Sequence, residues 1–130
     1  MSLLTASDGI AIALEDHDLP EPRARIVIVH GYAEHRGRYA HLVSRLVAHG
    51  FECHLFDLRG HGHSGGVPAH VAHFEQYVDD LQRVVDRVRA GADSPAPLII
   101  LGHSLGGLIS LQFARGNEKA WARPCSSTRR

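Results

Sequence analysis

Short apolar runs alternate with stretches of helical periodicity along this chain, and this alternation constrains the fold most. Residues 26–29 are uniformly apolar and β-branched, which is typical of a strand covered on both faces in a parallel sheet. Residues 51–56 and 98–101 predict two further strands. Apolar side chains recur at three- and four-residue spacing in residues 39–47 and 74–88, which predicts amphipathic helices. Because strands that alternate with helices need crossover connections, the sequence predicts an α/β fold with a mostly parallel sheet.

The two ends of the chain differ from one another. Residues 10–14, after the turn at Asp8-Gly9, predict an additional strand. Residues 115–130 show no apolar periodicity, although a parallel sheet should continue there with another strand. We therefore expect residues 1–114 to form the N-terminal part of one domain and residues 115–130 to be an atypical tail. Our hypothesis is that the coding sequence is truncated or read out of frame in this tail.

Composition excludes several classes of partner. Lys and Arg together number 14 and are balanced by 14 Asp and Glu residues, so no net field attracts nucleic acid or an anionic membrane. Neither a signal peptide nor an apolar run of about 20 residues occurs. We expect a cytoplasmic protein with no nucleic-acid partner and no integral membrane association.

A serine with flanking glycines follows the last predicted strand. The sequence Gly-His-Ser-Leu-Gly occupies residues 102–106, between that strand and a helix-like stretch. A G-x-S-x-G motif in this context predicts a nucleophile elbow, a sharp turn that holds the serine strained and exposed. A serine hydroxyl also needs a base to take its proton and donors to receive the charge on the carbonyl oxygen. Ser104 is therefore the candidate nucleophile.

The donors for that charge are predicted at two backbone positions. A nucleophile elbow uses the N–H of the residue after the serine, together with an N–H from the loop after an earlier central strand. His30 and Gly31 begin such a loop where the apolar run 26–29 ends. The candidate oxyanion donors are the N–H groups of Tyr32 and Leu105. The alternative is that His30-Gly31 is merely a turn that ends a strand.

Three segments together resemble a known family. In order, residues 30–39, 56–64 and 102–107 are similar to the N-terminal signatures of the monoacylglycerol lipase and lysophospholipase branch of the α/β-hydrolases, which is grouped with the serine aminopeptidases. The resemblance covers residues 5–114. It implies an α/β-hydrolase fold truncated after the elbow helix. It also implies a carboxylic ester hydrolase that forms an acyl-enzyme on Ser104 and takes a small lipid-like ester.

The same resemblance gives a role to two charged residues. In this branch, the loop that matches Glu34 and Arg38 lies beside the site for a glycerol-like head group. The resemblance implies that these residues bind a polar alcohol moiety or fix the shape of the loop. The alternative is a local ion pair without a further role.

The rest of a catalytic triad is missing from the sequence. In the α/β-hydrolases the chain order is Ser, then Asp or Glu, then His. After Ser104 the only acidic residue is Glu118, and no histidine follows. No family motif places Asp57, His30 or His61 in either role. We expect an impaired hydrolase; the alternative is an inactive hydrolase fragment or interaction module.

The sequence also contains incomplete patterns of a dinucleotide-binding site and of a metal site. Residues 60–65 satisfy G-x-G-x-x-G, but Pro68 follows instead of a helix, and the acidic residues about 20 positions on lie inside a predicted helix. The histidines of the same region lack the i, i+4 pairing with a nearby glutamate that catalytic metal helices use; they are His61, His63, His70 and His73. We expect no cofactor and no metal.

The last predicted strand raises the question of self-association. Residues 98–101 should lie inside the sheet, but the sequence shows no later strand to pair with their outer edge. An apolar exposed edge pairs readily with another chain. We expect self-association through this edge.

Overall fold

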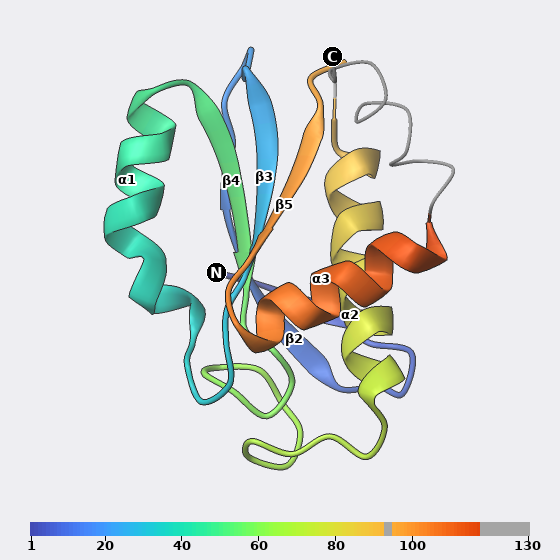
Figure 1. The fold of residues 1–130 in the computed structure, drawn as a ribbon. Coiled ribbons are helices and arrows are strands. Elements are labelled where there is room, and N and C mark those ends of the chain that lie inside the picture. The colour runs from blue at the N-terminus through green and yellow to red at the C-terminus, as the bar shows by residue number, and fades with distance from the viewer. Residues whose placement is uncertain (93–94, 118–130) are drawn as a thin grey trace.

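The computed structural model describes residues 1–92 and 95–117. Five strands form one sheet in the order β1-β2-β4-β3-β5 (Figure 1). The strands are β1 (Ser2–Thr5), β2 (Ala11–His17), β3 (Ala24–Val29), β4 (Phe51–Phe56) and β5 (Leu98–Gly102). The strands predicted at residues 26–29, 51–56 and 98–101 are confirmed, and the one predicted at 10–14 is longer than expected.

The sheet is mixed, with parallel pairing in its β4-β3-β5 part and antiparallel pairing on both sides of β2. Strand β3 pairs in parallel with both β4 and β5. In contrast, β2 pairs antiparallel with β1 and with β4. Because β1 and β2 are consecutive and separated by a short turn, they can pair as an antiparallel hairpin without a crossover helix. The parallel prediction therefore holds for the β4-β3-β5 part of the sheet.

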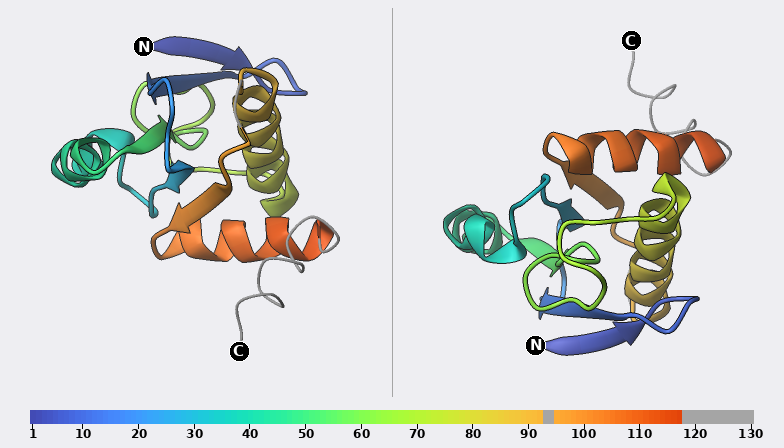
Figure 2. Two further views of the ribbon diagram at one scale, coloured as in Figure 1. Left: turned by 90° about the horizontal axis from the view of Figure 1, so that it is seen from above. Right: turned by 90° about the horizontal axis from the view of Figure 1, so that it is seen from below.

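Helices cover both faces of this sheet (Figures 1 and 2). Helix α1 (Ala40–Ala48), preceded by the 3₁₀ turn η1 (Arg36–Tyr39), lies on one face. Helices α2 (Phe74–Ala90) and α3 (Leu105–Gly116) lie on the other. None of these helices combines the length and the apolar character that a membrane crossing requires, within the described residues. Apart from the end of α3, the tail predicted at 115–130 lies outside the described residues.

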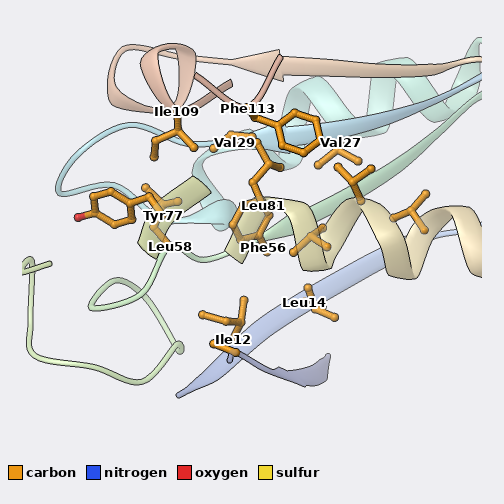
Figure 3. Packing of buried hydrophobic residues seen from close by; sticks show 14 residues of the cluster. Ile12, Leu14, Val27, Val29, Phe56, Leu58, Tyr77, Leu81, Ile109 and Phe113 are labelled. Carbon is orange, nitrogen blue, oxygen red and sulfur yellow. The ribbon is translucent and has the colours of Figure 1, made fainter. Parts of the chain in front are cut away.

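The hydrophobic core explains why residues 26–29 of the middle strand are uniformly apolar. All six residues of β3 are buried, because helices cover both faces of the sheet. The larger core cluster lies between the sheet and helices α2 and α3 (Figure 3); its largest members include Phe56, Leu81, Ile109 and Phe113. The smaller cluster lies beneath α1 and includes Val43. The core therefore fixes β3 from both sides.

The carboxyl ends of the three parallel strands are aligned. Val29 of β3 is in register with Phe56 of β4 and with Gly102 of β5. The loops that follow these strands therefore leave the sheet side by side, at the carboxyl ends of the strands. This alignment brings the three sequence segments that carry the predicted motifs together.

Candidate active site

Ser104 lies at the turn from β5 into α3, with a strained backbone. Its φ is 57° and its ψ is −116°, in a region that residues with a side chain rarely adopt. The residue is exposed. The sharp turn predicted from the G-x-S-x-G motif is therefore present in the structure, with the serine at its tip.

Two glycines allow this turn to pack closely. A Cβ atom at Gly102 would overlap the carbonyl of Gly106, and one at Gly106 would overlap the carbonyl of Val29. The N–H of His103 donates to that same Val29 carbonyl at 3.1 Å. The start of α3 is thus held directly against the end of β3, and only glycine fits at these positions.

The two candidate oxyanion amides lie on the segments that meet here. Leu105 is the first residue of α3, so its N–H has no acceptor within the helix. In the described part of the chain, neither this N–H nor that of Tyr32 donates a backbone hydrogen bond outside the regular elements. A Cβ atom at Gly31 would lie 3.2 Å from the carbonyl oxygen of His103. The loop that carries Tyr32 therefore touches the elbow.

His30 anchors this loop, which we call the oxyanion loop (residues 30–35). Its Nδ1 lies 2.7 Å from the Gly31 carbonyl oxygen, and the N–H of Leu58 donates to its Nε2 at 2.9 Å. These partners require a proton on Nδ1 and a lone pair on Nε2, so the ring is neutral. Burial lowers the pKa of His30. Both ring nitrogens are engaged, which leaves His30 no free acceptor for the proton of Ser104.

Glu34 organises the same loop from within. Its Oε1 accepts hydrogen bonds of 2.9 Å from the Gly31 N–H and from the Tyr39 hydroxyl. The Gly31 N–H, with the Tyr39 hydroxyl, lowers the pKa of Glu34 to about 2. Burial, with Glu34 alongside, raises the pKa of Tyr39 to about 12. The carboxylate thus stays charged at neutral pH and closes the loop on itself.

The two charged residues singled out in the sequence form an ion pair. Arg38 Nη1 lies 3.4 Å from Glu34 Oε2, and the Arg38 side chain is largely exposed. His103 Nδ1 lies 3.5 Å from the other carboxylate oxygen. Glu34 therefore links the oxyanion loop to the residue before the nucleophile, whereas Arg38 has its guanidinium at the surface.

Asp57 holds the loop that follows β4 (residues 57–73). The carboxylate is fully buried and accepts from the N–H groups of Arg36 at 2.8 Å and His63 at 2.9 Å. It also forms an ion pair with the Arg36 guanidinium. Asp57 therefore joins this loop to the start of η1, a structural role that its position at the end of an apolar strand did not reveal.

The histidines of this loop do not gather around a common point in the described residues. His61 is buried, and its Nδ1 lies 2.9 Å from the Arg59 carbonyl oxygen. His63 is largely exposed, with its Nδ1 3.9 Å from the Asp57 carboxylate. Among the described residues, the side chains whose ligand atoms lie within 4.8 Å of one another are Asp18, Glu52 and His54.

Glu52 and His54 of this group belong to a buried charged cluster that the sequence analysis did not predict. Glu52 and His54 lie on β4 and point to the face covered by α2. His54 Nε2 lies 2.7 Å from the Glu52 carboxylate, and His54 Nδ1 lies 2.7 Å from that of Asp16. Arg25 and Arg87 pair with these same carboxylates. Because every ring nitrogen and both carboxylates already have partners, the cluster is a structural ion network.

A cavity of about 510 Å³ adjoins this cluster. Its lining includes Asp18, Arg25 and Glu52, at the amino ends of the parallel strands. Ser104 follows the carboxyl end of β5. The cavity therefore lies at the opposite ends of the parallel strands from Ser104.

Comparison with known proteins identifies the family. The pattern described as serine aminopeptidase, S33, matches residues 20–125. The chain belongs to this family. Similar proteins include a monoacylglycerol lipase from Mycolicibacterium smegmatis, 42% identical over 93 residues. Human monoglyceride lipase is 37% identical over 94 residues, and a phospholipase from Bacillus subtilis is 33% identical over 94.

These matches also show what share of each relative's length the chain covers. Each covers 72% of this chain but 33%, 30% and 35% of the respective relative. The chain therefore spans about a third of the length of these relatives. The predicted resemblance to the monoacylglycerol lipase branch is confirmed.

Solved structures show the fold. An α/β hydrolase from Sphaerobacter thermophilus matches with a TM-score of 0.70 at 30% identity, over 88% of this chain and 40% of that one. The monoacylglycerol lipase of Paleococcus ferrophilus matches with a TM-score of 0.69 at 32% identity, over 82% and 38%. The described residues therefore form part of an α/β-hydrolase fold, as the resemblance implied.

Proposed function

We propose that this protein is a serine carboxylic ester hydrolase of the monoacylglycerol lipase or lysophospholipase type. One observation carries the proposal: Ser104 stands exposed on a strained turn between β5 and α3, where the loop after β3 touches the residue before it. The names of the relatives, monoacylglycerol lipase and phospholipase, support a small lipid-like ester as substrate.

The reaction follows from this geometry. In a complete enzyme of this type, Ser104 Oγ would attack the ester carbonyl carbon while a histidine base takes the hydroxyl proton and later returns it to the leaving alcohol. The N–H groups of Tyr32 and Leu105 bind the oxyanion of the tetrahedral intermediate. Collapse of the intermediate expels the alcohol and leaves an acyl-enzyme on Ser104, which water then hydrolyses. Glu34, within the oxyanion loop, and Arg38, in the turn η1 that follows it, are proposed to face the alcohol part of the substrate.

The 130-residue chain is proposed to carry out this reaction weakly. No histidine follows Ser104 in the sequence, and His30 is engaged at both ring nitrogens. Enzymes that lose triad members keep a residual acceleration of roughly 10³-fold over water through the oxyanion hole and binding. We expect activity of that order without an added base.

Labelling of the serine tests the proposal. A fluorophosphonate probe should attach to Ser104, identified by mass spectrometry of the labelled peptide, and Ser104→Ala should abolish the adduct. His103→Ala is the matched control, because it changes the neighbouring side chain and leaves the hydroxyl in place. A folded wild-type chain that gives no adduct at Ser104 would refute the proposed nucleophile.

A second candidate is an inactive hydrolase fragment or interaction module. It is favoured by the engagement of both ring nitrogens of His30, which leaves this histidine of the oxyanion loop unable to act as the base. The labelling experiment separates the two functions. A cooperatively folded chain without Ser104 reactivity fits the module, and a Ser104-dependent adduct fits the hydrolase.

A further inference from the structure

The oxyanion loop contains a strained turn that needs support. The N–H of Glu34 donates to the Gly31 carbonyl at 3.2 Å and closes a turn over Tyr32 and Ala33. Ala33 has a φ of 60°, a conformation that glycine adopts freely and that alanine resists. The peptide groups of this turn include the candidate oxyanion amide of Tyr32. A turn under strain at this position holds its orientation only if its surroundings fix it.

One side of the turn is fixed by Glu34. Its carboxylate accepts the Gly31 N–H at 2.9 Å and lies 3.5 Å from His103 Nδ1. These contacts hold the residue before Tyr32 against the elbow. They do not restrain the opposite side of the turn, where the Tyr32 side chain projects.

The Tyr32 side chain reaches across to the 57–73 loop. Its hydroxyl donates to the Ala69 carbonyl at 3.0 Å. The edge of its ring meets the ring of His61, with the centroids 5.6 Å apart and the planes at 76°. The side chain nevertheless remains 57% exposed, so it contributes little to the core. Its contacts bear on the position of the turn rather than on the stability of the fold.

The 57–73 loop is a firm support for this contact. The N–H of Ala69 donates to the Gly60 carbonyl at 2.8 Å, and the N–H of His70 donates to Val67 at 3.1 Å. Gly60 takes a φ of 74°, and a Cβ atom there would overlap the carbonyl of Val67. Ala69 itself has a φ of 53°, and the backbone hydrogen bonds on either side of its carbonyl do not involve Tyr32.

We propose that Tyr32 is a positioning residue. The hydrogen bond from its phenol to the Ala69 carbonyl holds the backbone N–H of Tyr32 in the orientation that binds the oxyanion. The proposal rests on the proposed ester hydrolase function. It assigns the side chain of Tyr32 a role separate from that of its amide, and it ties the 57–73 loop to catalysis. Glu34 and Tyr32 then fix the strained turn from its two sides.

Kinetics of serine labelling test this role. Tyr32→Phe removes the hydroxyl and keeps the ring, so the maximal labelling rate at Ser104 should fall about threefold to tenfold, the ratio that one net hydrogen bond supplies. The probe concentration at half-maximal rate should not change, because probe binding is untouched. Val67→Ala, which truncates an exposed side chain of the same loop, should label like the wild type. An unchanged rate in Tyr32→Phe would overturn the proposal.

A rescue experiment distinguishes positioning from a general effect. Glycine at position 33 accepts the positive φ without strain, so Ala33→Gly should restore most of the labelling rate in the Tyr32→Phe background. If the Tyr32 side chain acted only by contacting the substrate, Ala33→Gly would not restore the labelling rate. Failure of this double variant to label faster than Tyr32→Phe would also overturn the proposal.

Hydrogen exchange separates this inference from the proposed function. Tyr32→Phe should speed exchange of the Gly31 and Glu34 amides about threefold to tenfold, since both are bonded within the turn. If the wild type gives no adduct at Ser104, the hydrolase proposal fails and these exchange rates still decide whether Tyr32 holds the turn. Unchanged rates would show that it does not.

Discussion

At the scale of single residues, the elbow depends on the absence of side chains at two positions. Gly106 lies so close to β3 that a Cβ atom would overlap the carbonyl of Val29, and a backbone oxygen cannot turn aside as a flexible side chain can. The close approach of α3 to β3 is what places Ser104 beside the oxyanion loop. Stability and nucleophile position therefore rest on the same contact.

Gly106→Ala should thus destabilise the protein by about 1–3 kcal/mol, the range for overpacked sites. Denaturant unfolding followed by circular dichroism measures this change. The matched control is Gly116→Ala in the same helix, where an added Cβ would have nothing within 4 Å; its stability should stay the same or rise slightly. Equal effects of the two substitutions would contradict the packing argument.

The charge on Glu34 predicts a pH dependence. Its pKa falls from 4.5 to about 2 in the folded protein, so its contribution to stability is complete above pH 4.5 and is lost as the pH falls towards 2. Glu34→Gln should lower stability at pH 7 and flatten the stability curve between these two values. Denaturation midpoints across that interval give the comparison. Parallel curves for wild type and variant would rule out this linkage.

Residues with a local signal were predictable from the sequence, whereas those defined by distant partners were not. Ser104 could be found because its motif lies within five consecutive residues after a strand. The buried Asp57 could not be interpreted, because its role depends on Arg36, which lies 21 positions away. The Tyr32 contact with Ala69 spans 37 positions, and no short motif encodes such a pair.

At the scale of secondary-structure elements, β4 shows where apolar periodicity misleads. The strand was predicted without a role for its polar residues, yet Glu52 and His54 are each only 5% exposed. Arginines on β3 and α2 neutralise the cluster from both sides. Burial alone would raise the pKa of Glu52, but the Leu19 N–H and His54 hold it below its ordinary value. The charges can be buried because each one has a partner.

Removing one partner should therefore be costly. Arg25→Ala leaves the Glu52 carboxylate buried without its guanidinium, and we expect a loss of about 3–5 kcal/mol in unfolding free energy. Arg83→Ala provides the control, because Arg83 pairs with Asp79 in an exposed i, i+4 bridge that contributes less than about 1 kcal/mol. Thermal and urea unfolding of both variants should show this contrast, and similar losses would contradict it.

The predicted helices and central strands were found because burial imposes a period that the sequence displays. Strand β1 was missed because most of its residues are exposed and it pairs with one neighbour only, at the edge of the sheet. The antiparallel direction of β2 was missed as well. Apolar periodicity indicates which face of a strand is buried and carries no information about its direction.

At the scale of the whole molecule, the free edge of β5 predicts self-association of the 130-residue chain. Among the described residues β5 pairs with β3 alone, and its Ile99 is 44% exposed. An apolar strand edge of this kind pairs with a second copy. Sedimentation velocity should show concentration-dependent oligomers.

A charged side chain at the edge of β5 should reduce self-association. Ile99→Lys is expected to reduce the oligomers, whereas Leu3→Lys on the opposite edge strand β1 should leave them unchanged. A wild-type chain that sediments as a single monomer and unfolds cooperatively would refute self-association. Equal effects of both lysines would place the contact elsewhere.

The position of β3 between β4 and β5 has a consequence for how the chain is made. During synthesis β3 emerges first of the three, and one of its edges stays unpaired until β5 has been translated, some 70 positions later. The strand that completes the pairing of β3 is also the strand that leads into the turn at Ser104. A nascent or half-folded chain therefore lacks the assembled elbow. The reactivity proposed for Ser104 should appear only when the central sheet is built, so that a covalent probe would count folded molecules.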